Sequence, residues 1–127
     1  MLTNQRLARM AIHLNLPNKS NKYGARKTEY NGVMYDSKRE SEYARELDLR
    51  VRAHDILSWQ RQVKYPMIVK DIKITTYVAD FVITHNNGHI EIVDIKGVET
   101  PVFKLKAKLL KALYVQDNEF VTFNIIK

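Results

Sequence analysis

The sequence predicts an α/β fold of mixed α+β type, in which a helix, three strands, a second helix and a last strand follow one another. Two apolar segments, residues 76–83 and 89–97, alternate their side chains as strands do, and an Asn-Asn-Gly turn signal at 86–88 separates them. Residues 37–53 and 100–115 instead repeat apolar side chains at helical spacing. A chain of 127 residues has the length of one domain.

The N-terminus differs in composition from the rest of the chain. We expect residues 1–28 to lie outside the domain formed by residues 29–127. Residues 3–14 predict a short helix with Thr3 as its N-cap. Residues 17–28 are polar and basic, and a nucleic-acid-binding arm and a solvated linker explain them equally well.

The first half of the predicted domain contains a turn, a helix and an extended segment. Asn31-Gly32 predicts a hairpin or turn over residues 30–35. The helix is expected from about Ser37 to Ala53. Residues 56–69 are expected to be extended and interrupted by Pro66.

The second half begins with the two strands named above and ends with a helix and a strand. Thr100 fits the N-cap of that helix, Pro101 fits its first position, and Val115 ends it. Residues 120–126 predict the last strand.

Composition limits the function. The net charge of +7 suggests a polyanionic partner, first a nucleic acid and second an acidic membrane surface. The absence of cysteine excludes disulfides, zinc fingers and thiol nucleophiles. No run of about 18 apolar residues predicts a membrane span. We therefore expect a cytoplasmic protein.

Two acids and a lysine stand inside the two predicted strands. Asp80 lies on the first strand, and Asp94 and Lys96 lie two residues apart on the second, so that their side chains share a face. Such charges are costly unless they are paired or bind a metal. A metal site beside a base suits hydrolysis of a phosphodiester. The structural alternative is a buried ion pair between Lys96 and one of the acids.

The expected cofactor is Mg²⁺ or Mn²⁺, one or two ions per site, because hard cations prefer oxygen ligands. Asp80 and Asp94 are expected as direct ligands, with the backbone carbonyl of Ile95 as another. Lys96 is expected to orient or deprotonate the attacking water, or to stabilise charge on the phosphate.

Glu40 is a third candidate ligand, directly or through water. It shares the apolar face of its helix with Tyr43, Ala44 and Leu47, which would turn it toward the sheet. Residues 37–40 also match a capping box, in which Glu40 bonds back to the helix start. Its occurrence with the strand acids favours the metal-site role.

A shared metal site requires a particular hairpin register. Asp80 and Asp94 are directly opposite only if the loop centres on Asn87. A three-residue loop ending in a left-handed Gly88 meets this condition. A two-residue turn would place Asp80 across from Ile95, with the acids on opposite faces.

These residues resemble the active site of the PD-(D/E)xK nuclease superfamily. Ala79-Asp80 stands where Pro-Asp is usual in that superfamily, and residues 94–96 match its acid-x-Lys motif. A closer similarity covers residues 20 to about 115 and resembles small phage or prophage nucleases described as Holliday junction resolvases. The segments that carry it are 21–27, 35–40, 60–62, 77–81, 93–97, Thr100 and 104–109.

The resemblance implies a restriction-endonuclease-like core, with a mixed central sheet flanked by helices. It also implies a homodimer that introduces paired nicks across a four-way DNA junction during recombination, in the bacterial host cell. Two alternatives stay open: a nicking or restriction-type endonuclease, and a non-catalytic DNA-binding module. Gln62 is a possible accessory residue of the site, or an ordinary surface glutamine.

Basic residues outside the site are candidates for phosphate contacts, with a solvated basic surface as the alternative. They are Lys19, Lys22, Arg26, Lys27, Lys38, Lys104, Lys108 and Lys111. Residues 85–89, His-Asn-Asn-Gly-His, superficially resemble an HNH nuclease motif. We expect a hairpin loop there, because no separate helix supplies a further ligand.

Overall fold

The structure is a computed structural model that describes residues 26–127. The chain divides into two units, residues 1–43 and 44–127, and each is treated by itself. The helix expected over residues 3–14 and most of the expected basic arm lie outside the described residues. The predicted domain boundary after residue 28 stays a prediction.

The described part of the first unit contains a hairpin and the start of a helix. Strand β1 (Thr28–Tyr30) pairs antiparallel with β2 (Val33–Tyr35). Asn31 and Gly32 form the turn with φ of 53° and 77°, which Asn and Gly tolerate better than other residues. The hairpin predicted from Asn31-Gly32 is confirmed.

Helix α2 (Lys38–Arg52) crosses the boundary between the units. Residues 44–52 belong to the second unit. There, Asp48 Oδ1 accepts a hydrogen bond of 3.0 Å from Trp59 Nε1, which ties the helix to β3. The helix expected from Ser37 to Ala53 is confirmed within one residue at each end.

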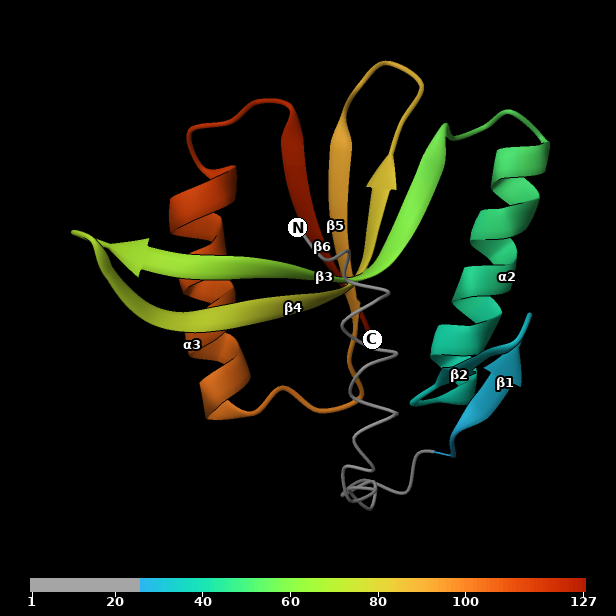
Figure 1. Ribbon diagram of the computed structural model, residues 1–127, viewed down its shortest axis with the longest axis horizontal. Helices are drawn as coiled ribbons and strands as arrows, with labels where there is room; N and C mark the ends of the chain where they lie inside the picture. The colour runs from blue at the N-terminus through green and yellow to red at the C-terminus, as the bar shows by residue number, and fades with distance from the viewer. Residues whose placement is uncertain (1–25) are drawn as a thin grey trace. The chain divides into compact units, whose positions relative to one another are not determined.

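A four-stranded sheet dominates the second unit (Figure 1). Its order is β3 (Ser58–Val69), β4 (Ile72–Thr84), β5 (Ile90–Ile95) and β6 (Val121–Ile126). The first three strands run antiparallel and β6 runs parallel to β5, so the sheet is mixed. The mixed α+β class is confirmed.

Helix α3 (Pro101–Leu110) connects the parallel strands β5 and β6. Thr100 Oγ1 accepts a bond of 3.1 Å from the N–H of Phe103, which confirms the predicted N-cap. The helix continues as a π-helical turn over Lys111–Val115 rather than as the expected α-helix. Nothing in the local sequence signals the wider turn.

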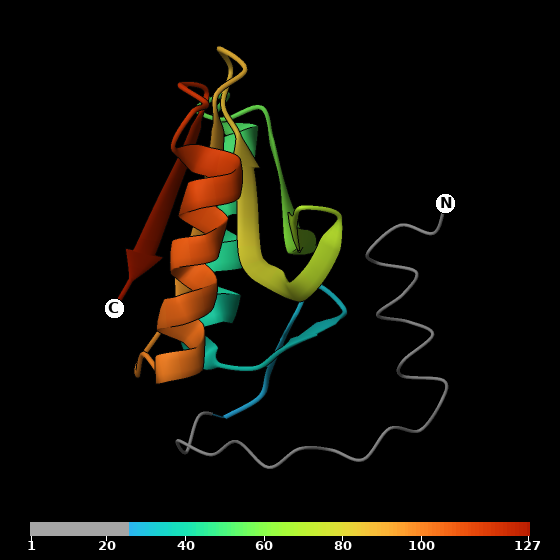
Figure 2. The ribbon, with the colours of Figure 1, turned by 90° about the vertical axis from the view of Figure 1, so that its left-hand side faces the viewer.

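Figures 1 and 2 show that β3 and β4 bend, and that their connected ends lie alongside α3. Between the sheet and α3 lies a core of apolar side chains, which removes their surface from water. Its buried members are Met67, Tyr77, Ala79, Val82, Ile92, Ala107 and Leu110.

The interruption of β3 at Pro66 was predicted wrongly. The strand continues through Pro66, which is paired with Thr76. Because β3 lies at the edge of the sheet, it has no neighbouring strand on its outer side. A proline can lack an N–H on that side without losing a hydrogen bond between strands. The Pro66 carbonyl accepts a bond of 2.6 Å from the Tyr114 hydroxyl.

Strand β4 begins at Ile72, earlier than the expected residue 76. The turn before it uses Lys70 and Asp71, whose φ values are 49° and 66°. Lys-Asp is a weak turn signal, which explains the missed boundary. Within residues 26–127, no helix combines the length and apolar character needed to span a membrane.

Candidate functional site

The β4–β5 hairpin has the register on which a shared acid site depends. Its pairs run from Thr84↔Ile90 to Phe81↔Val93, and the next pair in this register is Asp80 with Asp94. Residues 86–88 form the loop, with Gly88 at a φ of 89°. The N–H of His85 donates to the carbonyl of His89 at 2.8 Å and closes the loop. The predicted three-residue loop is confirmed.

The strand pairing of β4 and β5 ends at Phe81 and Val93, and the two acids bind the backbone beyond it. The N–H of Asp80 donates to Asp94 Oδ1 at 2.9 Å. The N–H of Ile95 donates to Asp80 Oδ2, also at 2.9 Å. Each carboxylate thus bonds to the opposite strand, and the structure brings Asp80 and Asp94 together.

Asp94 carries the main electrostatic anomaly. It is 1% exposed, and its Oδ2 atom is buried with no hydrogen-bond partner among the described residues. Burial raises the pKa of its carboxyl from 3.8 to about 6, while the Asp80 N–H and the Lys96 charge act in the opposite direction. A buried carboxylate with an unsatisfied oxygen has a strong tendency to take up a proton or a cation.

Lys96 lies in the same cavity as Asp94, as expected from their shared strand face. Its Nζ atom is 4.7 Å from the centre of the Phe103 ring. No ion pair joins Lys96 to Asp94 in the described chain. The alternative in which a direct Lys96–Asp94 ion pair neutralises the acid is therefore not the observed arrangement.

The cavity has a volume of about 250 Å³. It lies where β4 and the end of β5 meet α3, and it combines three charged groups with apolar walls. It is lined by Thr76, Tyr77, Val78, Asp94, Lys96, Thr100, Val102, Phe103 and Lys106.

Gln62 occupies an unusual backbone position beside the acids. The pairs Arg61↔Phe81 and Val63↔Ala79 flank it, so Gln62 lies opposite Asp80 where the ladder skips a pair. Its φ is 50°, a left-handed conformation that costs a residue other than glycine about 1 kcal/mol or more. Such strain is frequent at functional sites, and the accessory role of Gln62 stays a prediction from the sequence.

Glu40 lies in the first turn of α2. Its N–H donates to Ser37 Oγ at 3.1 Å, which is one half of the capping box. Glu40 belongs to the first unit and the strand acids to the second. Its place in the metal site therefore stays a prediction from the sequence.

The predicted basic contacts are distributed over several elements. Lys19 and Lys22 lie outside the described residues. Lys38 is exposed, and its Nζ atom lies 3.8 Å from Glu42 Oε1. Exposed positions are also occupied by Arg26, Lys27, Lys104, Lys108 and Lys111.

Tyr77 and Lys106 line this cavity but were not among the site residues predicted from the sequence. Both lie in segments that carry the resemblance, residues 77–81 and 104–109. Lys106 follows Phe103 by three positions and precedes Leu110 by four, so it borders the apolar face of α3. That spacing was the available signal.

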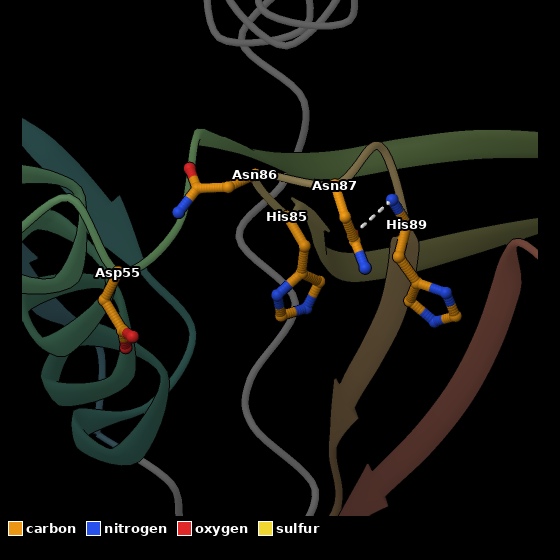
Figure 3. A pocket seen from close by; sticks show the side chains of 5 residues that line it. All are labelled: Asp55, His85, Asn86, Asn87 and His89. Carbon is orange, nitrogen blue, oxygen red and sulfur yellow. Dashed lines mark hydrogen bonds between the residues drawn. The ribbon is translucent and has the colours of Figure 1, made fainter.

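A second cavity, of about 400 Å³, lies at the tip of the β4–β5 hairpin (Figure 3). His85 and His89 line it, but His85 Nε2 lies 2.9 Å from Glu91 Oε1 and His89 Nε2 lies 3.0 Å from Thr122 Oγ1. The tip is the hairpin loop that was expected in place of an HNH site. Within residues 26–127, no three His, Cys, Asp or Glu side chains are grouped so that they could hold a metal ion.

The family model for DUF1064, described as "Protein of unknown function (DUF1064)", matches residues 20–125. The chain belongs to the DUF1064 family. No curated protein matches this DUF1064 member. No solved structure matches it either. The matched range covers the hairpin, both strand acids and all of α3, so the site lies within the part of the chain that defines the family.

Proposed function

We propose that this DUF1064 protein is a metal-dependent, structure-selective DNA endonuclease with a restriction-endonuclease-like core, and that it acts as a Holliday junction resolvase. One observation supports this more than any other. Asp80 and Asp94 each accept a backbone hydrogen bond from the opposite strand where β4–β5 pairing ends, and Asp94 Oδ2 is buried with no hydrogen-bond partner among the described residues. Lys96 lines the same cavity as Asp94.

The donor set fits Mg²⁺ or Mn²⁺. Mg²⁺ is usually bound by one or two carboxylates, and water and substrate phosphate oxygens complete its coordination. Asp80 and Asp94 supply the carboxylates, and Asp94 Oδ2 is an oxygen with no competing hydrogen bond among residues 26–127. The Ile95 carbonyl and Glu40 are the further proposed ligands. A third acid from the described second unit is not needed for such a site.

The bound cation supplies a Lewis acid that polarises the phosphate and favours ionisation of a water. The residues of the chain hold and orient the reacting groups. Asp80 and Asp94 would hold the cation, and Lys96 would either position the attacking water or stabilise charge on the phosphate. In the hydrolysis, the water oxygen forms a bond to phosphorus as the bond from phosphorus to the 3′-oxygen breaks. One proton of the water is lost, the 3′-oxygen takes up a proton to become a hydroxyl, and a 5′-phosphate remains.

The element order supports the proposed core. From α2 onward, a helix, three strands, a helix and a strand follow one another, and β6 joins the sheet parallel to β5. The net charge of +7 supports a DNA substrate. The preference for junctions and the homodimer rest on the resemblance of the sequence to phage junction resolvases.

Cleavage assays on several DNA structures test the proposal. The purified protein is incubated with a synthetic four-way junction, a duplex and a flap, each with Mg²⁺ or with EDTA. We expect paired, symmetric nicks in the junction when Mg²⁺ is present and no nicks in EDTA. Equal cleavage of duplex would instead support a nicking or restriction-type enzyme. Binding without metal-dependent cleavage of any substrate would contradict the proposal and support a DNA-binding module.

A further inference from the structure

The cavity beside Asp94 contains a second cationic group that the acid-x-Lys motif does not include. Lys106 lines it from α3, and Lys96 lines it from the end of β5. The Lys106 ammonium donates to the carbonyl of Thr76 at 3.2 Å. An ammonium has three N–H donors, so this bond leaves donors for another acceptor.

Lys106 differs from its neighbours on the same helix. Lys104 and Lys108 are exposed, whereas Lys106 is half-buried. A half-buried lysine is costly unless its head group reaches an acceptor or an anion. The charge of Lys106 is thus placed at the cavity, and its helix neighbours point their charges to solvent.

A second wall residue also points to a polar ligand. The hydroxyl of Tyr77 is buried with no hydrogen-bond partner among the described residues, and the side chain as a whole is 2% exposed. The centre of its ring lies 6.2 Å from that of Phe103 and 5.9 Å from that of Phe123. Buried hydroxyls usually find a partner, so an unsatisfied one at a cavity is a candidate ligand contact.

We infer that Lys106 binds a phosphate of the cleaved DNA strand, next to the phosphate at Asp80 and Asp94. The inference rests on the proposed function and extends it by one residue that contacts the substrate. The volume of about 250 Å³ lies just below the range of about 300–1,000 Å³ that is usual for drug-sized ligands. It suits a phosphate and its sugar, with Phe103 and Val102 as apolar walls.

The test measures DNA affinity without cleavage. Binding of a fluorescent four-way junction in EDTA is followed by anisotropy at several salt concentrations for Lys106→Met, Lys106→Arg and Lys73→Gln. Lys73 is exposed on β4, and Lys73→Gln is the control because it also removes one positive charge. We expect Lys106→Met to bind about tenfold more weakly, as for a lost charge-assisted hydrogen bond. The slope of the logarithm of the binding constant against the logarithm of the salt concentration should become smaller in magnitude by about 0.7 to 0.9. This is the value for one phosphate contact.

The two other variants are expected to behave differently. Lys106→Arg keeps the charge and should bind within about threefold of the unmodified protein. Lys73→Gln should leave the affinity and the slope close to those of the unmodified protein. If Lys106→Met has the affinity and slope of Lys73→Gln, Lys106 only supports the Thr76 carbonyl and the inference is overturned.

A modified substrate gives a second measurement, which begins with the unmodified protein. Single methylphosphonates remove the charge of one phosphate at a time along the strand. With the unmodified protein, we expect one position adjacent to the cleaved bond to lose about tenfold in affinity. Combined with Lys106→Met, that position should cause little further loss, because the two changes remove the same contact. If the affinity losses from Lys106→Met and from the methylphosphonate multiply at every position of the strand, the inference is overturned.

These binding results and the cleavage result can be told apart. If the unmodified protein cuts no DNA with Mg²⁺ or Mn²⁺, the proposed function fails. The anisotropy and methylphosphonate data still decide whether Lys106 contacts a phosphate. If cleavage occurs but Lys106 shows no coupling to any phosphate, the proposed function stands and the inference fails.

Discussion

At the scale of single residues, Asp94 shows a conflict between stability and the proposed activity. Its carboxyl is almost fully buried, one of its oxygens lacks a partner in the described chain, and burial raises its pKa to about 6. The folded protein therefore binds a proton at Asp94 more tightly than the unfolded chain does. A group placed for fold stability alone would show the opposite shift, because a paired carboxylate usually has a lowered pKa.

This shift predicts a pH-dependent effect of Asp94→Asn. The folded-state pKa of about 6 is above the ordinary 3.8, so the wild-type protein loses stability as the pH rises through that interval. Two pKa units correspond to roughly 3 kcal/mol as an upper value. Asn carries no charge, so we expect Asp94→Asn to gain about 1–2 kcal/mol over wild type at pH 8 in EDTA, and little at pH 4. Urea unfolding at both pH values measures the difference.

The control for this prediction is Asp117→Asn, which removes an exposed acid. Asp117→Asn should change its free energy of unfolding between pH 4 and pH 8 by the same amount as the wild-type protein does. Mg²⁺ at pH 8 should stabilise wild type but not Asp94→Asn, because a ligand stabilises the folded state only where it binds. A wild-type protein that gains stability from pH 4 to pH 8 relative to Asp94→Asn would contradict the assigned pKa direction.

At the scale of elements, the β4–β5 hairpin decides whether the acids can act together. A slip of one residue would turn Asp80 and Asp94 to opposite faces. The register is held by the three-residue loop, in which Gly88 has a φ of 89°. The Gly88 N–H donates to the His85 carbonyl at 2.9 Å.

A pair of glycine substitutions tests the role of the loop. A Cβ added at Gly88 or at Gly97 meets no other heavy atom within 4 Å, but only Gly88 of the two has a positive φ. We expect Gly88→Ala to lower the free energy of unfolding by about 1–2 kcal/mol, because the left-handed conformation is unfavourable for alanine. Gly97→Ala should leave it nearly unchanged. Equal unfolding midpoints of the two variants in urea would contradict the assigned loop conformation.

The sequence was sufficient to predict the features that depend on local pattern. The alternation around Asp80 and Asp94 predicted two strands, and the symmetry about Asn87 predicted their register. The left-handed Gln62 was not predictable, because the ladder irregularity around it comes from tertiary pairing. Lys106 was not predicted as a site residue because a lysine on a helix is usually solvated. Its spacing from Phe103 and Leu110 was a weak signal, and the cavity separates it clearly from the exposed Lys104.

At the scale of the whole molecule, the basic charge and the acid site have complementary roles. The net charge of +7 favours association with a polyanion. The negative charges of Asp80 and Asp94 oppose the positive net charge at the site. They repel phosphates unless a cation neutralises them. We therefore expect DNA binding to depend mainly on the basic residues and cleavage to depend on the acids. Asp80 and Asp94 belong to one unit and Glu40 belongs to the other, and the role of Glu40 stays a proposal.

Junction cleavage by Asp80→Asn, measured beside its junction affinity, tests the central claim most directly. With Mg²⁺, we expect this variant and Asp94→Asn to lose cleavage by about 100-fold or more, the scale of an electrostatic contribution to the transition state. Both should bind the junction within about threefold of wild type in EDTA, because that binding rests on the basic contacts. Glu40→Gln should also reduce cleavage if its carboxylate joins the site, and Asp117→Asn should cleave normally. Full activity of Asp80→Asn would contradict the claim that the Asp80–Asp94 pair forms the metal site of a nuclease.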